Sequence, residues 1–94
     1  MTLARVVEFD GVTNDRIEQL RQEIGEGGRP EDVPATEIVL LHAPDAERSL
    51  AILFFDNEED YRRGDAALDA MPAGDTPGSR RSVTKYAVAI RMQV

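Results

Sequence analysis

TEIVLLHAPDAERSLAILFF, residues 36–55, is the stretch of the chain that decides its fold. Two β-type segments, TEIVLLH and LAILFF, flank a polar connection, APDAERS, that contains a proline. This arrangement predicts a β-hairpin. Both arms carry apolar residues on both sets of alternating positions, whereas a strand with water on one side alternates apolar and polar residues. We therefore expect a sheet that is covered on both faces.

The residues before the hairpin predict a strand followed by a helix. Residues 3–9 alternate weakly and include β-branched side chains, which favours a strand. In the next segment Ile17, Leu20 and Ile24 lie at helical spacing, and Thr13 or Asn14 can cap the helix. The glycines at positions 25, 27 and 28 predict its end, because glycine tolerates the left-handed conformation beyond a helix C-terminus.

A second helix is predicted directly after the hairpin. Asp56 begins it, since its side chain can accept a hydrogen bond from the first turn. The apolar stripe of this helix consists of Tyr61, Gly64, Leu68 and Met71. A glycine costs roughly 1 kcal/mol in a helix interior. Its place on the stripe therefore predicts that the helix and the sheet approach each other closely at Gly64.

A loop over residues 72–81 and a last strand from Ser82 to about Met92 complete the order β-α-β-β-α-β. This order predicts the ferredoxin-like fold of the α+β class, with a four-stranded antiparallel sheet and two helices on one face. Residues 1–94 are expected to form a single domain. Because two helices cover only one face of a small sheet, the apolar second face predicts a homodimer that buries it.

Composition excludes several classes of function. The chain has no cysteine and one histidine, so we expect neither a metal nor another cofactor. The formal net charge of −7 disfavours binding to nucleic acid and to anionic membranes. The first ten residues, MTLARVVEFD, lack the pattern of a secretory signal, and no apolar run reaches membrane-spanning length. The expected location is the cytoplasm.

The passage FFDNEEDYRRGDAAL, residues 54–68, together with the element order, resembles the dimeric α+β barrel superfamily. This group includes antibiotic-biosynthesis-monooxygenase-like and stress-responsive barrel domains, in which two sheets pack face to face across a dimer axis. The resemblance implies a homodimer, with activities that range over cofactor-free oxygenation, isomerisation, haem degradation and none. The haem-degrading branch is the least similar, because its second helix supplies a histidine ligand and residues 56–71 contain no histidine.

Three residues are candidates for acid–base chemistry. The only histidine, His42, has a suitable unperturbed pKa of about 6.5. A histidine at a strand end more often makes structural hydrogen bonds, and we favour that interpretation. Tyr61 lies on the apolar stripe of the second helix, and Tyr86 shares a strand face with apolar residues. Core packing is therefore favoured over catalysis for both tyrosines.

Three cations, Arg5, Lys85 and Arg91, are the candidate ligand-binding residues, together with Tyr61 and Tyr86. Arg5 lies among apolar residues of the first strand, and Lys85 and Arg91 flank two alanines of the last strand. The first and last strands are neighbours in a ferredoxin-like sheet, so these cations could line one cavity. They would then need carboxylates or an anionic ligand, because an unpaired buried charge is costly. Alternatively, the last strand is an edge whose cations face water.

The sequence leaves two functions open. The first is a dimeric α+β barrel protein that binds a small hydrophobic or aromatic acid between helices and sheet, with cofactor-free oxygenase or isomerase chemistry. The second is a non-catalytic module for dimerisation or ligand sensing. Neither is favoured by the residues alone.

Overall fold

The computed structural model describes residues 1–27, 33–70 and 77–94, and within these ranges the chain forms four strands and two α-helices. In chain order these are β1 (Leu3–Asp10), α1 (Asn14–Gly27), β2 (Glu37–Ala43), β3 (Arg48–Phe55), α2 (Glu58–Asp69) and β4 (Ser79–Ala87). A short 3₁₀-helix, Pro44–Ala46, joins β2 to β3. Three predicted features, the side chain of Ile24, the glycine at position 28 and Met71, lie outside the described part.

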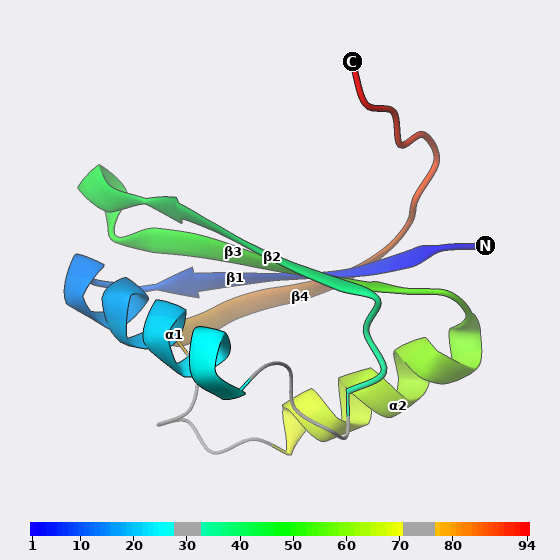
Figure 1. Ribbon diagram of the computed structural model, residues 1–94, viewed down its shortest axis with the longest axis horizontal. Helices are drawn as coiled ribbons and strands as arrows, with labels where there is room; N and C mark the ends of the chain where they lie inside the picture. Colours follow the sequence, from blue (N-terminus) through cyan, green and yellow to red (C-terminus); the bar gives the residue numbers. More distant parts are fainter. Residues whose placement is uncertain (28–32, 71–76) are drawn as a thin grey trace.

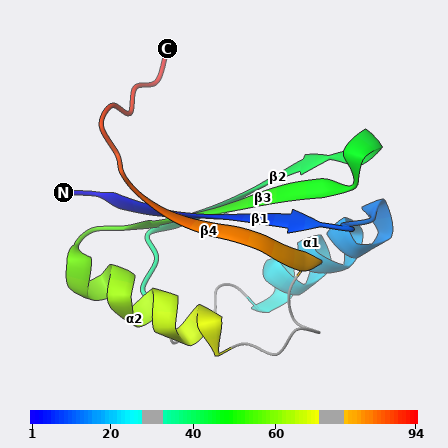
Figure 2. The same ribbon diagram turned by 180° about the vertical axis from the view of Figure 1, so that it is seen from behind.

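The four strands form one antiparallel sheet in the order β2-β3-β1-β4. In Figures 1 and 2, α1 and α2 lie on the same side of this sheet, and the segment after β4 rises on the other side. This arrangement confirms the predicted ferredoxin-like α+β fold. Neither α1 nor α2 is long and apolar enough to cross a membrane, and the same holds for every helix in the described ranges.

The strand register assigns each side chain to one of two faces, because successive side chains of a strand point to opposite sides. Arg5 contacts α2, so the odd-numbered residues of β1 face the helices. We call this side the helix face and the other side the open face. The open face includes Ala4, Val6 and Glu8 of β1, Glu37, Val39 and Leu41 of β2, Leu50, Ile52 and Phe54 of β3, and Ser82, Thr84 and Tyr86 of β4.

The core lies between the helix face and the two helices, in two clusters of buried side chains. Under α2 it comprises Leu3, Val33, Ala35, Leu53, Phe55 and Tyr61. Towards α1 it comprises Val7, Phe9 and Val12, against which Ile17 packs. Ala51 of β3 packs against both clusters, so the core is continuous below β3.

Side-chain caps set the first residues of both helices. Thr13 Oγ1 accepts a hydrogen bond from the amide of Arg16 at 3.1 Å, as predicted for α1. The predicted cap of α2 was wrong by one residue. Asn57, and not Asp56, has the extended backbone of a cap, and its Oδ1 accepts from the amide of Asp60 at 2.8 Å. Both side chains are capping types, so composition alone does not separate them.

The predicted bounds of the last strand were also wrong, because β4 spans Ser79–Ala87 and not Ser82 to Met92. At its start, β4 crosses an irregularity and continues beside the end of β1, where Arg80 lies opposite Phe9. At its end, Ala87 lies opposite Leu3, the first residue of β1. The amide of Val88 still donates to the carbonyl of Thr2 at 2.9 Å, and beyond it the described chain offers no neighbouring strand.

Gly64 of α2 lies close against the Phe55 ring of β3, as its position on the apolar stripe predicted. A Cβ atom at this position would lie 2.6 Å from Cζ of the Phe55 ring, well inside van der Waals contact. Phe55 is fully buried and also packs edge-on against Tyr61, with ring centroids 5.4 Å apart. Because the Phe55 ring has little room to move aside, only a residue without a Cβ atom allows α2 to pack this closely against it.

We expect Gly64→Ala to lower the free energy of unfolding by about 1–3 kcal/mol, because overpacking outweighs the gain in helix propensity. Urea denaturation measures the change. Ala66→Gly, at an exposed position of the same helix, is the matched control and should cost about 1 kcal/mol from propensity alone. A more stable Gly64→Ala protein would contradict the close approach.

Candidate functional site

The most unusual group in the structure is a buried guanidinium on the central strand β1. The side chain of Arg5 is only 2% exposed. Its Nε donates to Asp65 Oδ1 at 2.8 Å, and its Nη2 donates to Asp69 Oδ1 at 3.2 Å.

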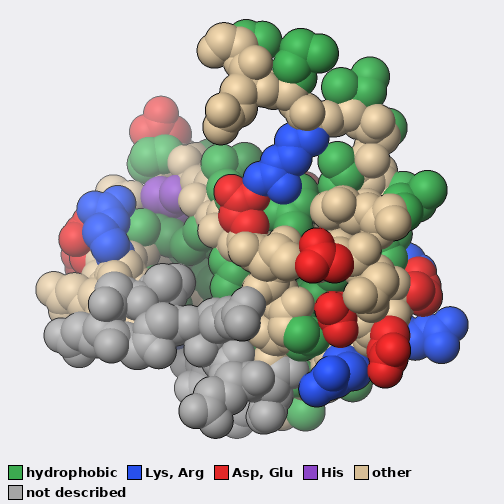
Figure 3. Space-filling model, turned by 45° about the vertical axis from the view of Figure 1, so that its right-hand side comes forward, with side chains coloured by type: hydrophobic (Ala, Val, Ile, Leu, Met, Phe, Trp, Pro, Cys, Tyr) green, Lys and Arg blue, Asp and Glu red, His purple; other side chains and the backbone are tan. Residues whose placement is uncertain are grey.

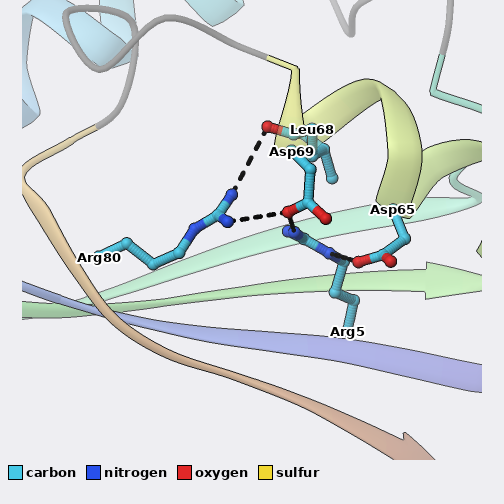
Figure 4. Close-up of polar contacts among 5 residues, drawn as sticks. All are labelled: Arg5, Asp65, Leu68, Asp69 and Arg80. Atoms are coloured by element: carbon cyan, nitrogen blue, oxygen red, sulfur yellow. Dashed lines mark hydrogen bonds and ion pairs between the residues drawn. The ribbon is translucent and has the colours of Figure 1, made fainter.

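Both carboxylates come from α2, where they are four residues apart and therefore lie on one side of the helix (Figure 4). The two aspartates are partly exposed, so water reaches the outer side of the network.

A second arginine joins this network from the edge strand β4. Arg80 Nη1 donates to Asp69 Oδ1 at 2.8 Å, and its Nη2 donates to the carbonyl of Leu68 at 3.5 Å (Figure 4). One carboxylate oxygen of Asp69 thus accepts from two guanidinium groups. The cluster of Arg5, Arg80, Asp65 and Asp69 carries two positive and two negative charges. It is neutral as a unit.

Lys85 lies beside Arg5 on the helix face, directly opposite it in the strand register. Its Nζ pairs with Glu58 Oε1 and lies 5.0 Å from the centroid of the Tyr61 ring. The hydrogen bond from Lys85 lowers the pKa of the Glu58 carboxyl below its usual value. Burial raises the pKa of the Tyr61 hydroxyl, and the negative charge of Asp65 raises it further. Tyr61 therefore stays protonated at neutral pH and serves as a packing residue.

Of the three cations that could line one cavity, only two lie together. Arg5 and Lys85 are neighbours on the helix face, whereas Arg91 lies beyond the end of β4 on the other side of the sheet. The guanidinium of Arg91 stacks over the Phe54 ring at 4.5 Å and pairs with Glu37 at the start of β2. The prediction extended β4 to Met92 and so placed Arg91 on the same face as Lys85.

The placement of Tyr86 was also predicted wrongly. Tyr86 lies on the open face, is 54% exposed, and belongs to neither core cluster. The apolar residues expected to share its strand face, such as Ile90, follow the end of β4. In a single chain, about half of the surface of this large aromatic residue is therefore exposed to water.

His42 makes two hydrogen bonds that join the hairpin to the first helix. Its Nδ1 lies 2.8 Å from the hydroxyl of the buried Ser49, and its Nε2 lies 3.0 Å from Oδ1 of Asn14. An amide oxygen can only accept, so Nε2 carries a hydrogen and donates to Asn14, and in the neutral imidazole Nδ1 then accepts from the Ser49 hydroxyl. The structural interpretation of His42 predicted hydrogen bonds near the hairpin, and both ring nitrogens are used in this way. The partners are side chains and not the backbone groups expected.

Sequence reasoning required carboxylates or a ligand for Arg5 but did not identify the carboxylates. A signal was present, since Asp65 and Asp69 follow Tyr61 of the apolar stripe at steps of four along α2. Glu58 lies in the acidic first turn of α2, and its pairing with Lys85 depends on how α2 lies over β4. In the described ranges, no group of three or more acidic or histidine side chains is placed to hold a metal ion.

Comparison of the chain with models of known protein families, with curated protein sequences and with solved structures found no significant match. The properties of this site therefore follow from its geometry alone.

We expect removal of the two aspartates to destabilise the protein more than removal of Arg5. The double variant Asp65→Ala/Asp69→Ala leaves a buried guanidinium without a carboxylate beside it, and should lose about 2–4 kcal/mol of unfolding free energy. Arg5→Met fills the same apolar layer and leaves carboxylates that water can solvate, so it should cost about 1 kcal/mol or less. Urea denaturation of each variant at neutral pH measures both values.

The control for this comparison is Glu18→Ala/Glu23→Ala, which removes two exposed carboxylates that pair with arginines on α1. Exposed ion pairs contribute little, so this variant should stay within about 1 kcal/mol of the parent. Equal losses in Asp65→Ala/Asp69→Ala and in Arg5→Met would show that burial of the guanidinium does not determine the cost.

We expect His42→Gln to keep the fold and to lose about 0.5–1.5 kcal/mol, the usual contribution of a hydrogen bond that can be partly replaced. Thermal and urea unfolding measure the loss, and Ser49→Ala serves as a comparison that removes only the Nδ1 contact. Collapse of the fold in His42→Gln would show that this residue has a larger role than joining the hairpin to α1.

Proposed function

We propose that this protein is a homodimeric, non-catalytic α+β module whose open sheet face associates with the same face of a second copy. The observation that carries the proposal is the composition of that face. Its centre is apolar, with Val6, Val39, Leu50 and Ile52 on three adjacent strands. Helices α1 and α2 both lie on the other side of the sheet (Figure 2).

Two large side chains of the open face are half-exposed in the single chain. Leu41 on β2 is 50% exposed and Tyr86 on β4 is 54% exposed. They lie on opposite edges of the face, since β2 and β4 are the outer strands of the sheet. Full burial of such a side chain stabilises an interface by about 1.5–3 kcal/mol. In a symmetric dimer each contribution occurs twice, which helps to offset the cost of association.

The charges around this apolar centre are compatible with the association of two identical open faces. The acidic groups are Glu8, Asp10 and Glu37, and the basic groups are Arg48, Arg81 and Arg91. Each basic group pairs within this set, and Glu8 accepts from Ser82. The rim is thus balanced, although the chain as a whole carries a formal charge of −7. Two copies can meet through this face with little electrostatic repulsion.

The resemblance to the dimeric α+β barrel superfamily supports the same geometry, because two sheets pack face to face in that group. The packing of two twisted sheets buries alternate side chains from both, about 10 Å apart. The alternating side chains of β3 and β2 on the open face suit such a layer. A homodimer of this kind would give the sheet the second covered face that the hairpin sequence implies.

The alternative expectation, an enzyme or receptor for a small hydrophobic or aromatic acid, has less support. An anionic ligand would have to displace Asp65 or Asp69 from Arg5, or Glu58 from Lys85. His42 already uses both ring nitrogens. The acid-binding function therefore stays a prediction, while the dimerisation module is the conclusion that the geometry favours.

Sedimentation equilibrium at micromolar concentration tests the proposal, and we expect a species of twice the 10.4 kDa chain mass. Leu41→Gln should raise the dimer dissociation constant by about 100-fold or more, since it removes apolar burial in both copies. Ile38→Gln is the matched control, because Ile38 lies on the same strand but on the helix face, at 39% exposure. It should leave the dissociation constant within about threefold of the parent.

A parent protein that sediments only as a monomer would refute the proposed function. Equal effects of Leu41→Gln and Ile38→Gln on association would mean that the interface does not use the open face.

A further inference from the structure

The segment Val88–Val94, which we call the tail, leaves the sheet on the side of the open face. Figures 1 and 2 show it rising away from the end of β4 on the side opposite α1 and α2. In the space-filling view of Figure 3 it stands off the body of the molecule as an arch. Its only described backbone bond to the rest of the chain is the one from Val88 to Thr2.

One side chain fixes the tail above the open face. Arg91 stacks on the Phe54 ring and pairs with Glu37, so the tail extends from β4 towards the β2 side of the sheet. The residues on either side of Arg91 are largely exposed to water. Ile90 is 82% exposed and Met92 is 75% exposed. Large apolar side chains at two alternate positions are thus held out in water beside an apolar sheet face.

The sequence of the tail has the pattern of a strand, although the tail forms none. Val88, Ile90, Met92 and Val94 alternate with Ala89, Arg91 and Gln93. Such a period of two is typical of a strand with one buried side. A strand also needs a neighbour for its backbone hydrogen bonds. Within the described chain the tail has none, because β1 begins opposite Ala87.

We propose that the tail is an exchanged arm, in which Ile90 and Met92 of each copy pack against the open face of the other copy. This inference rests on the proposed homodimer and specifies a contact within it. Face-to-face sheets lie about 10 Å apart. Arg91 ties the tail to Phe54 and Glu37 on the side of the open face (Figure 1). Ile90 and Met92 therefore lie on the side of the sheet from which a second sheet would approach.

The arm would complete each subunit's interface with residues from the other. Arg91 is the charged side chain of the tail and is already paired with Glu37 on its own subunit, so the side chains left for the partner, Ile90 and Met92, are apolar. That side matches the apolar centre of the open face and not its charged rim. A symmetric dimer forms this contact twice.

The test compares two double variants of the full chain that change the same tail. Ile90→Ser/Met92→Ser removes the apolar side that faces the partner and keeps Arg91. Ala89→Ser/Gln93→Ser alters the intervening positions and is the matched control. By sedimentation equilibrium we expect the first variant to raise the dimer dissociation constant at least about tenfold and the control to change it less than about threefold.

Nuclear magnetic resonance supplies the second readout. In mixed dimers of isotope-labelled and unlabelled chains, isotope-filtered spectra should show cross-peaks between the methyl groups of Ile90 and Met92 and open-face side chains of the other subunit. Cross-peaks confined to one chain, or equal dissociation constants for the two double variants, would overturn the exchanged arm and leave the homodimer standing. A monomeric parent protein would overturn both.

Discussion

The arrangement of this protein depends on the neutralisation of one buried guanidinium. Arg5 lies on the central strand between Leu3, which belongs to the cluster under α2, and Val7, which belongs to the cluster towards α1. A charge in that position is tolerated only with carboxylates in hydrogen-bonding contact. Asp65 and Asp69 meet this requirement from consecutive turns of α2. A shift of α2 by one residue would withdraw both carboxylates and leave the guanidinium buried without a partner.

Much of the fold could be predicted from the sequence, because strand and helix periodicities are local properties. The hairpin arms, the helical stripe through Gly64 and the order of elements all depend on residues within a few positions of one another. The end of β4 could not be predicted in this way. The alternating pattern continues past Ala87, but a strand exists only beside another strand, and β1 begins at Leu3. Where a strand stops is decided by a neighbour more than 80 residues away.

The candidate site was less predictable for the same reason. The need of Arg5 for a carboxylate follows from elementary electrostatics, yet the identity of Asp65 and Asp69 follows only when α2 lies across β1. Lys85 could be placed beside Arg5 from the topology of the sheet. Arg91 and Tyr86 were misplaced because their surroundings were inferred from the overlong strand. Both side-chain errors therefore have one cause, the predicted extension of β4 beyond the end of its pairing with β1.

The position of Arg5 also bears on how the chain folds during synthesis. β1 precedes β3 and β4 in the chain but lies between them in the sheet. It stays unpaired until the ribosome has released residues far along the chain, since domains assemble when their distant segments become available. A purely apolar strand in that interval invites aggregation, and a charge within it acts as a gatekeeper. Arg5 places such a charge within β1, and in the folded chain the carboxylates of Asp65 and Asp69 neutralise it.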